Sequence, residues 1–212
     1  MTDDLIARLS ADLQPVSPRA LQRKLLLAVL IGLVLTIALT FSVLDLRPDI
    51  KLALSASIFW IKFGYTLGLG LVGTWAVERL SRPGSSARWP TILAAVIVIV
   101  VASLAMVGYQ HAPLDARAAM VWGTSAMVCP FLIAGLSIPV LAAILLAMRQ
   151  LAPTRLELAG AAAGLMAGGL GAWVYSFHCP ESGLPFLAIW YSLGIIVEMG
   201  LGALLGRFIL RW

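Results

Sequence analysis

Six long runs of apolar residues, separated by short charged connectors, constrain this chain more than any other feature. They lie near residues 25–44, 54–77, 90–109, 124–148, 157–176 and 186–206. A helix of about 20 apolar residues spans the roughly 30 Å hydrocarbon core of a bilayer. Because the runs are continuously apolar rather than alternating, they do not fit a barrel of strands. The sequence predicts an all-α, polytopic membrane protein, with six transmembrane helices over residues 25–212 and a short polar segment over residues 1–24.

The placement of the basic residues predicts how this bundle is oriented. The chain has 61% hydrophobic and 12% charged residues and a net charge of +5. Eleven basic residues lie on one predicted side, namely Arg8, Arg19, Arg23, Lys24, Arg79, Arg82, Arg88, Arg149, Arg155, Arg207 and Arg211. The other side holds three, which are Arg47, Lys51 and Arg117. By the positive-inside rule, both termini are expected to face the cytoplasm. The positive charge therefore reports topology, and no direct nucleic-acid partner is expected.

The polar N-terminal segment has the pattern of a short amphipathic helix. Thr2, Asp3 and Asp4 suit a helix start. An apolar stripe follows at helical spacing and consists of Leu5, Ile6, Leu9 and Leu13. The helix is expected to end before Pro15. Two interpretations remain open: a helix lying on the inner membrane surface, and a helix that docks into the groove of a partner protein.

Two charged residues, Lys62 and Glu198, fall inside the predicted spans. Counted along the apolar runs, both lie near the midplane, and both lie on faces rich in glycine or small polar residues. Insertion of a lone charged side chain at that depth costs about 2.5–3.5 kcal/mol, so two opposite charges are expected to pair. We predict a structural ion pair between Lys62 and Glu198, with an ion or proton pathway as the alternative. Glycines at four-residue spacing in spans five and six predict close helix packing.

The two cysteines, Cys129 and Cys179, both map to the outer side of the membrane. In an oxidising compartment they could form a disulfide. His111 and His178 map to the same side, so the four residues also offer soft and borderline ligands to a metal. Buried, inert thiols are the third interpretation. The sequence has no nucleophile elbow, zinc-protease motif, phosphate loop or dinucleotide fingerprint, so no enzyme is predicted.

Several local motifs together resemble one protein family. They are Thr2-Asp3-Asp4-Leu5-Ile6, Phe59-Trp60-Ile61-Lys62, Ala152-Pro153-Thr154, Tyr175-Ser176-Phe177-His178-Cys179-Pro180-Glu181, Pro185-Phe186, Trp190-Tyr191, and the ending Gly202-Ala203-Leu204-Leu205-Gly206-Arg207 with Leu210-Arg211-Trp212. The chain is similar to the NrsF-type anti-sigma factors of proteobacteria. These are six-span inner-membrane proteins that restrain an extracytoplasmic-function sigma factor. The similarity runs nearly end to end, and the C-terminal block is its most specific part.

The resemblance implies a role for each feature. Residues 1–24 would bind the sigma factor through Leu5, Ile6, Leu9 and Leu13, and Cys129 and Cys179 would sense a periplasmic metal or redox stress. No cofactor is implied beyond a transient heavy-metal ion at the cysteines. The expected partners are the sigma factor and membrane lipids, with no small-molecule substrate. Two other hypotheses are a small transporter or channel built around Lys62 and Glu198, and a membrane subunit that only scaffolds other proteins.

Overall fold

A computed structural model describes residues 18–151 and 153–211, and these ranges contain helices and connectors but no strand. The first helices are α2 (Pro18–Val43), α3 (Ile50–Ser55), α4 (Ser57–Leu80) and α5 (Arg88–His111). They are followed by α6 (Leu114–Trp122), α7 (Cys129–Met148) and α8 (Leu156–Tyr175). The last segment is one bent helix, made of α9 (Leu184–Phe186), a π-helical turn (Leu187–Tyr191) and α10 (Ser192–Ile209).

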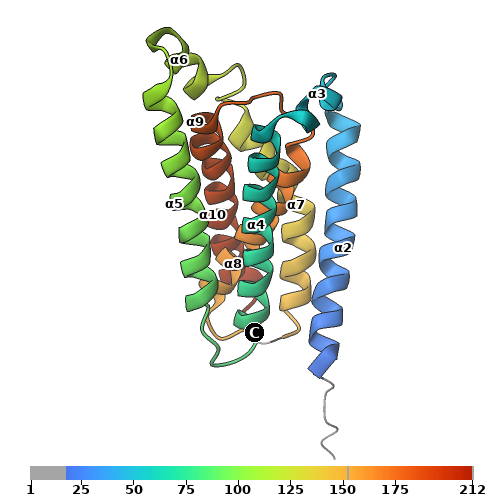
Figure 1. The fold of residues 1–212 in the computed structure, drawn as a ribbon. Coiled ribbons are helices and arrows are strands. Elements are labelled where there is room, and N and C mark those ends of the chain that lie inside the picture. Colours follow the sequence, from blue (N-terminus) through green and yellow to red (C-terminus); the bar gives the residue numbers. More distant parts are fainter. Residues whose placement is uncertain (1–17, 152, 212) are drawn as a thin grey trace, which may run out of the picture.

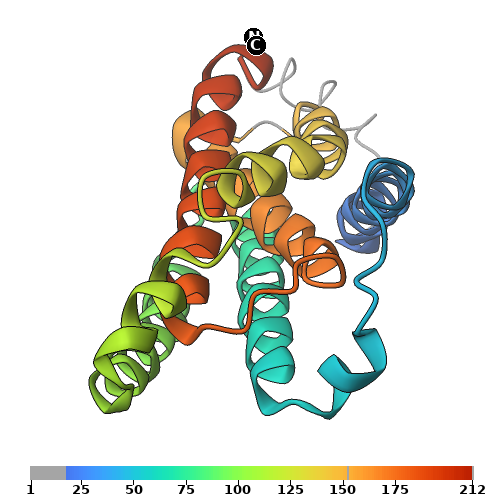
Figure 2. The ribbon, with the colours of Figure 1, turned by 90° about the horizontal axis from the view of Figure 1, so that it is seen from above.

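The long helices run up and down side by side, with α8 at the centre of the bundle (Figures 1 and 2). Helix α8 packs against α10, α4, α7 and α2. Helix α2 starts at the end of the bundle where α10 finishes, and we call this the C-terminal end (Figure 1). The short helices α3, α6 and α9 lie at the opposite end, which we call the thiol end because Cys129 and Cys179 lie there (Figure 1).

Helix α8 can occupy the centre because small residues cover most of its surface. A Cβ atom added at Gly160 would lie 3.0 Å from the Cα of Gly206, and one added at Gly164 would lie 2.6 Å from the Cα of Met199. On the other side of α8, a Cβ at Gly73 of α4 would lie 2.6 Å from the Cα of Met166. Such close approach between backbones is how small residues stabilise helix contacts in lipid. The expected glycine packing face is therefore present.

Five of these helices, rather than the predicted six, are long and apolar enough to cross a membrane: Ala20–Val43 of α2, then α5, α7, α8 and the bent helix Leu184–Ile209. Helix α4 has sufficient length, at 24 residues, but is not among these five. It contains Lys62 together with several glycines and polar residues. The predicted second run also began too early, because a break at Ala56 separates α3 from α4.

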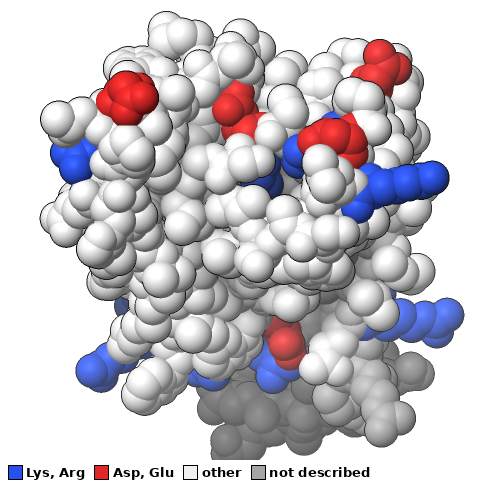
Figure 3. Space-filling view, turned by 45° about the horizontal axis from the view of Figure 1, so that its top comes forward, with Lys and Arg blue, Asp and Glu red and all other residues white. Residues whose placement is uncertain are grey.

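The exposed surface of the bundle fits an apolar solvent. Only 17% of the apolar window of α2 and 11% of that of α5 is buried, so apolar side chains cover their outward faces. The space-filling view shows charged residues near both ends with mostly uncharged surface between them (Figure 3). This distribution is the one expected of a helical membrane protein.

Candidate functional site

The two cysteines lie together in the interior of the thiol end. Cys129 is the first residue of α7, and Cys179 lies in the connector between α8 and α9. Both thiols are free and fully buried. They share one apolar cluster with Tyr175 and Tyr191, whose ring centroids are 5.9 Å apart. Residues 50 positions apart in sequence thus form a thiol pair shielded by aromatic rings.

The connector that carries Cys179 is held by two cationic side chains. Lys62 of α4 donates from Nζ to the carbonyl oxygens of Cys179, at 3.3 Å, and Glu181, at 2.6 Å. Arg47, which follows α2, donates to the same Cys179 carbonyl at 3.3 Å and forms a 2.7 Å salt bridge with Asp49. The backbone N–H of Arg47 also donates to the carbonyl of Phe177 at 3.1 Å. We call Lys62 and Arg47 the cationic clamp.

The acidic end of the connector is anchored to the segment that precedes α7. The Glu181 Oε1 atom accepts hydrogen bonds from the backbone N–H and the hydroxyl of Thr124, both at 2.7 Å, and from the hydroxyl of Ser125 at 3.3 Å. Burial disfavours the charged carboxylate, but the bonds from Thr124 and Ser125 outweigh it and lower the pKa of Glu181. The N–H of Cys129 in turn donates to the carbonyl of Ser125 at 2.9 Å. The two cysteine-bearing segments are therefore tied to each other beside the thiols.

This environment favours a thiolate at Cys179. The hydrogen bond from the Cys129 thiol outweighs burial and, aided by the positive charge of Lys62, lowers the pKa of Cys179 to about 5. A thiolate is the nucleophilic form of cysteine, and a neighbouring cation is a common cause of its stabilisation. The pair can therefore be oxidised once a reagent reaches it, with Cys179 as the attacking sulfur and Cys129 as its neighbour.

The structure does not form the predicted ion pair between Lys62 and Glu198. The Lys62 ammonium binds carbonyl groups of the connector, and both carboxyl oxygens of Glu198 are buried without a hydrogen-bond partner among the described residues. Depth explains the error. Lys62 is five residues from the start of α4, or about 8 Å, whereas Glu198 is fourteen residues from Leu184, or about 21 Å at 1.5 Å per residue. The transporter hypothesis loses the feature on which it was built.

The histidines do not join the thiols. His178 shares a 2.6 Å hydrogen bond between Nδ1 and the carbonyl of Asp45, and His111 is an exposed residue at the end of α5. Across residues 18–151 and 153–211, no three His, Cys, Asp or Glu side chains are grouped in a way that could hold a metal ion. The structure therefore does not bring the four predicted ligands together, and of the four only Cys129 and Cys179 are neighbours.

The other expected site lies beyond the described part of the chain. Leu5, Ile6, Leu9 and Leu13 precede residue 18, so their predicted role stays a prediction. Conversely, sequence reasoning used Arg47 only as a topology marker and did not expect the anchoring role of Glu181. The signal for Glu181 was its position two residues after Cys179, in a connector that is long enough to fold back over the thiols.

Comparison with known proteins agrees with the resemblance seen in the sequence. The family model described as "Negative regulator of sigma F" matches residues 9–212. The "Probable anti-sigma-F factor NrsF" of Azospira oryzae is 41% identical over 212 residues, covering 100% of this chain and 99% of that protein. The "Anti-sigma-F factor NrsF" of Caulobacter vibrioides is 42% identical over 215 residues, with the same coverage. No solved structure matches the chain.

The family match spans nearly the whole chain, and both relatives are covered over almost their full length. The family role is regulatory rather than enzymatic. The chain belongs to the NrsF family, the negative regulators of sigma F.

Proposed function

We propose that this chain is an inner-membrane anti-sigma factor that holds an extracytoplasmic-function sigma factor and releases it when the thiol pair is chemically changed. The observation that carries the proposal is full-length identity of 41% and 42% to two proteins named anti-sigma-F factors. The thiol pair supplies a place where an external signal can act. In this account α4 is the sixth membrane-spanning helix, because it packs inside the bundle against α8 rather than facing lipid alone.

The proposed orientation places the C-terminal end of the bundle in the cytoplasm. Described basic residues at that end are Arg23, Lys24, Arg79, Arg82, Arg88, Arg149, Arg155, Arg207 and Arg211. The thiol end carries Arg47, Lys51 and Arg117 outside α4. The positive-inside rule then puts the thiols on the periplasmic side, in an oxidising compartment. A reporter fused after Trp212 is expected to be cytoplasmic, and one inserted at Ser182 periplasmic. The reverse result would overturn the orientation.

The sensing step that we propose is a two-electron oxidation of the thiol pair by a hydroperoxide. The Cys179 thiolate attacks the terminal hydroxyl oxygen of the peroxide, the O–O bond breaks, and Cys179 becomes a sulfenic acid. The alkoxide leaves with the electron pair of that bond and takes a proton from solvent to give an alcohol. The Cys129 sulfur then displaces the hydroxyl group, which leaves as water with the thiol proton. One thiolate, one thiol, one hydroperoxide and one proton from solvent thus become one disulfide, one alcohol and one water. A thiol-binding metal bridging the two sulfurs is the alternative signal, and it would have only these two cysteine ligands.

Helix α2 is the element best placed to carry the change to the cytoplasm. At the thiol end it leads into Arg47, which binds the Cys179 connector. Along its length it packs on α7, the helix that starts with Cys129: Thr36 donates to the carbonyl of Leu136 at 3.1 Å, and a Cβ at Gly32 would lie 2.7 Å from the Cα of Val140. A change at the thiols therefore reaches one continuous helix through two contacts.

At its other end, α2 is joined to the last turn of α4, to the connector between α7 and α8, and to the proposed sigma-binding segment. Gln22 donates to Glu78 at 3.0 Å, and Lys24 donates to Gln150 at 2.6 Å. The segment before residue 18 is covalently continuous with this helix. A movement of α2 that favours one thiol state can alter sigma binding only if the sigma factor has different affinity for the two positions. We propose that the reduced thiol state has the higher affinity.

The binding segment is tested by a reporter of sigma-dependent transcription in the native host. Leu5→Asp with Leu9→Asp places charge on the apolar stripe, and it should release the sigma factor and turn the reporter on while the protein stays in the membrane fraction. A few apolar anchors commonly dominate such a small interface. The matched control is Ala7→Asp with Ala11→Asp, on the opposite face of the same predicted helix. Full repression by the Leu5 and Leu9 variant would show that the segment is not the anchor.

A further inference from the structure

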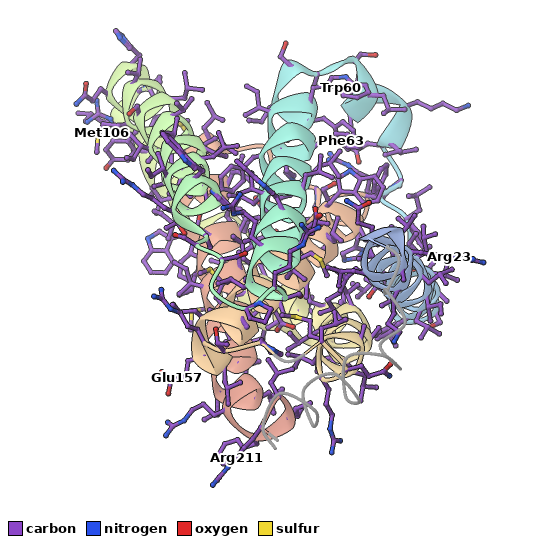
Figure 4. All side chains as sticks on the ribbon, turned by 90° about the horizontal axis from the view of Figure 1, so that it is seen from below. Arg23, Trp60, Phe63, Met106, Glu157 and Arg211 are labelled. Carbon is purple, nitrogen blue, oxygen red and sulfur yellow. The ribbon has the colours of Figure 1, made fainter. Side chains whose placement is uncertain are left out.

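A large apolar groove between α5 and the rest of the bundle has no part in the proposed signalling route. Its volume is about 830 Å³, which falls within the 300–1,000 Å³ range of ligand-binding cavities. Helices α4, α5, α8 and α10 all line it. Helix α5 packs along α4 and touches α9 and the π-helical turn near the thiol end, so its remaining length stands off from α8 and α10. Figures 2 and 4 show α5 at the edge of the bundle beside α4.

The lining of the groove changes from basic to apolar along its length. Arg88, at the start of α5, and Arg155, just before α8, border it at the C-terminal end. Small residues such as Ala94, Ala95 and Ala161 then leave room between the helices. Among the described residues, no acidic side chain lines the groove. The apolar stretch matches an acyl chain, and the two guanidinium groups match a negatively charged headgroup.

Neither arginine has an acidic partner in the part of the chain that the structure describes. Glu157, the carboxylate nearest to Arg155 in sequence, instead pairs with Arg207 at 3.2 Å at the C-terminal end of the bundle. The guanidinium of Arg88 lies 6.0 Å from the ring centroid of Trp89, which is 63% exposed. Exposed tryptophans next to basic residues are typical of the headgroup level of a bilayer.

The length of the groove corresponds to one leaflet. From Arg88 to Ile99, the farthest lining residue on α5, the helix rises about 17 Å at 1.5 Å per residue. Half of the roughly 30 Å hydrocarbon core is about 15 Å. Near its inner end, the groove is crossed by a 2.6 Å hydrogen bond between the hydroxyls of Tyr65 and Ser192, which joins α4 to α10. An acyl chain that starts at the arginines would therefore end near the bilayer midplane.

We propose that this groove binds one anionic phospholipid from the leaflet at the C-terminal end of the bundle. One acyl chain fills the space between α5 and the helices α8 and α10, and the phosphate is bound by Arg88 and Arg155. Only the identification of this leaflet as the cytoplasmic one rests on the proposed membrane orientation. The lipid-binding proposal does not depend on sigma binding. The competing occupant is a second copy of the chain. Its lipid-facing surface is uncharged, so it would offer no negative charge to the two arginines.

The experiment measures lipid retention by the full-length protein after extraction in mild detergent. Phosphatidylglycerol or phosphatidylcholine is added back, and bound lipid is counted by native mass spectrometry. Bound phosphatidylglycerol, with little phosphatidylcholine, is the expected result for the wild type. Each basic residue near a bilayer surface contributes about 1 kcal/mol to anionic lipid binding. Arg88→Gln with Arg155→Gln should therefore weaken phosphatidylglycerol binding about 30-fold, which corresponds to about 2 kcal/mol at 1.4 kcal/mol per tenfold.

Two further variants separate the site from general charge and from folding. Arg149→Gln with Arg211→Gln removes the same charge at the same end without touching the groove, and it should bind phosphatidylglycerol like the wild type. Ala95→Phe with Ala161→Phe fills the groove and should exclude both lipids while the arginines remain. Equal binding of the two lipids, equal loss in both arginine variants, or retention in the filled variant would each overturn the proposal. A dimer cross-linked through α5 in place of bound lipid would do the same.

Discussion

Replacing Gly164 by alanine should drive α8 and α10 apart. The new Cβ would overlap the carbonyl oxygen of Glu198 and lie 2.6 Å from the Cα of Met199, and both are backbone atoms that no rotamer change can move. Inserting a methyl group into a close-packed interface typically costs about 1–3 kcal/mol. The same substitution also reduces the backbone entropy that is lost on folding, and this stabilises a helix by about 0.5–1 kcal/mol. A comparison with the wild type alone would therefore underestimate the steric cost.

Gly200→Ala provides the matched control, because it lies in the same helix pair and its added Cβ meets nothing within 4 Å. The propensity gain is common to both variants, so the difference between them isolates the overlap. We expect Gly164→Ala to have a free energy of unfolding lower than that of Gly200→Ala by about 1–3 kcal/mol. The assay is reversible unfolding of the full-length protein in mixed micelles, followed by tryptophan fluorescence. If Gly164→Ala is as stable as Gly200→Ala, the close contact between α8 and α10 is not what holds the bundle.

Three other predictions concern the thiol end. Lys62→Met removes two charge-assisted hydrogen bonds to the connector, each worth about 1.5–3 kcal/mol, and should lower thermal stability, whereas Lys51→Met, at an exposed position, should not. The rate at which Cys179 is alkylated, with the modified residue identified by mass spectrometry, should not change between about pH 6 and 8, because a pKa of about 5 leaves the thiol ionised throughout this range. A tenfold rise in the rate per pH unit would contradict this. The pKa of Glu181 is lowered in the folded state, so its carboxylate stabilises the fold above its usual pKa, and this stabilisation is lost as the pH falls through the folded value. Glu181→Gln should therefore reduce the loss of stability on acidification. An unchanged loss of stability at low pH would refute this.

The sequence predicted the helical bundle and its glycine faces because both depend on local pattern. Apolar length marks a spanning helix, and glycine at four-residue spacing, as at Gly160 and Gly164, marks a face whatever its partner. The apolar runs also approximated the ends of α5 and α8, but not the break at Ala56. That break shifted the start of α4, and with it the depth assigned to Lys62.

Partners across helices could not be predicted in the same way. The charge of Lys62 seemed to require a carboxylate, yet backbone carbonyls of a connector satisfy it at 3.3 and 2.6 Å. A connector's path is not encoded in periodicity, so the hydrogen bonds of Glu181 could not be foreseen. The shared side of Cys129 and Cys179 followed from counting spans, whereas their burial together follows from how α7 and the connector pack.

The most direct test of the central claim measures sigma retention by the membrane-embedded protein in the two thiol states. Each extracytoplasmic-function sigma factor of the host is co-produced with the full-length chain, membranes are prepared under reducing conditions, and the bound sigma factor is quantified before and after a hydroperoxide is added. The account predicts that one sigma factor is retained and then released by the wild type, but stays bound to Cys129→Ser and Cys179→Ser. Equal release from the cysteine variants, or no retained sigma factor in reduced membranes, would contradict it.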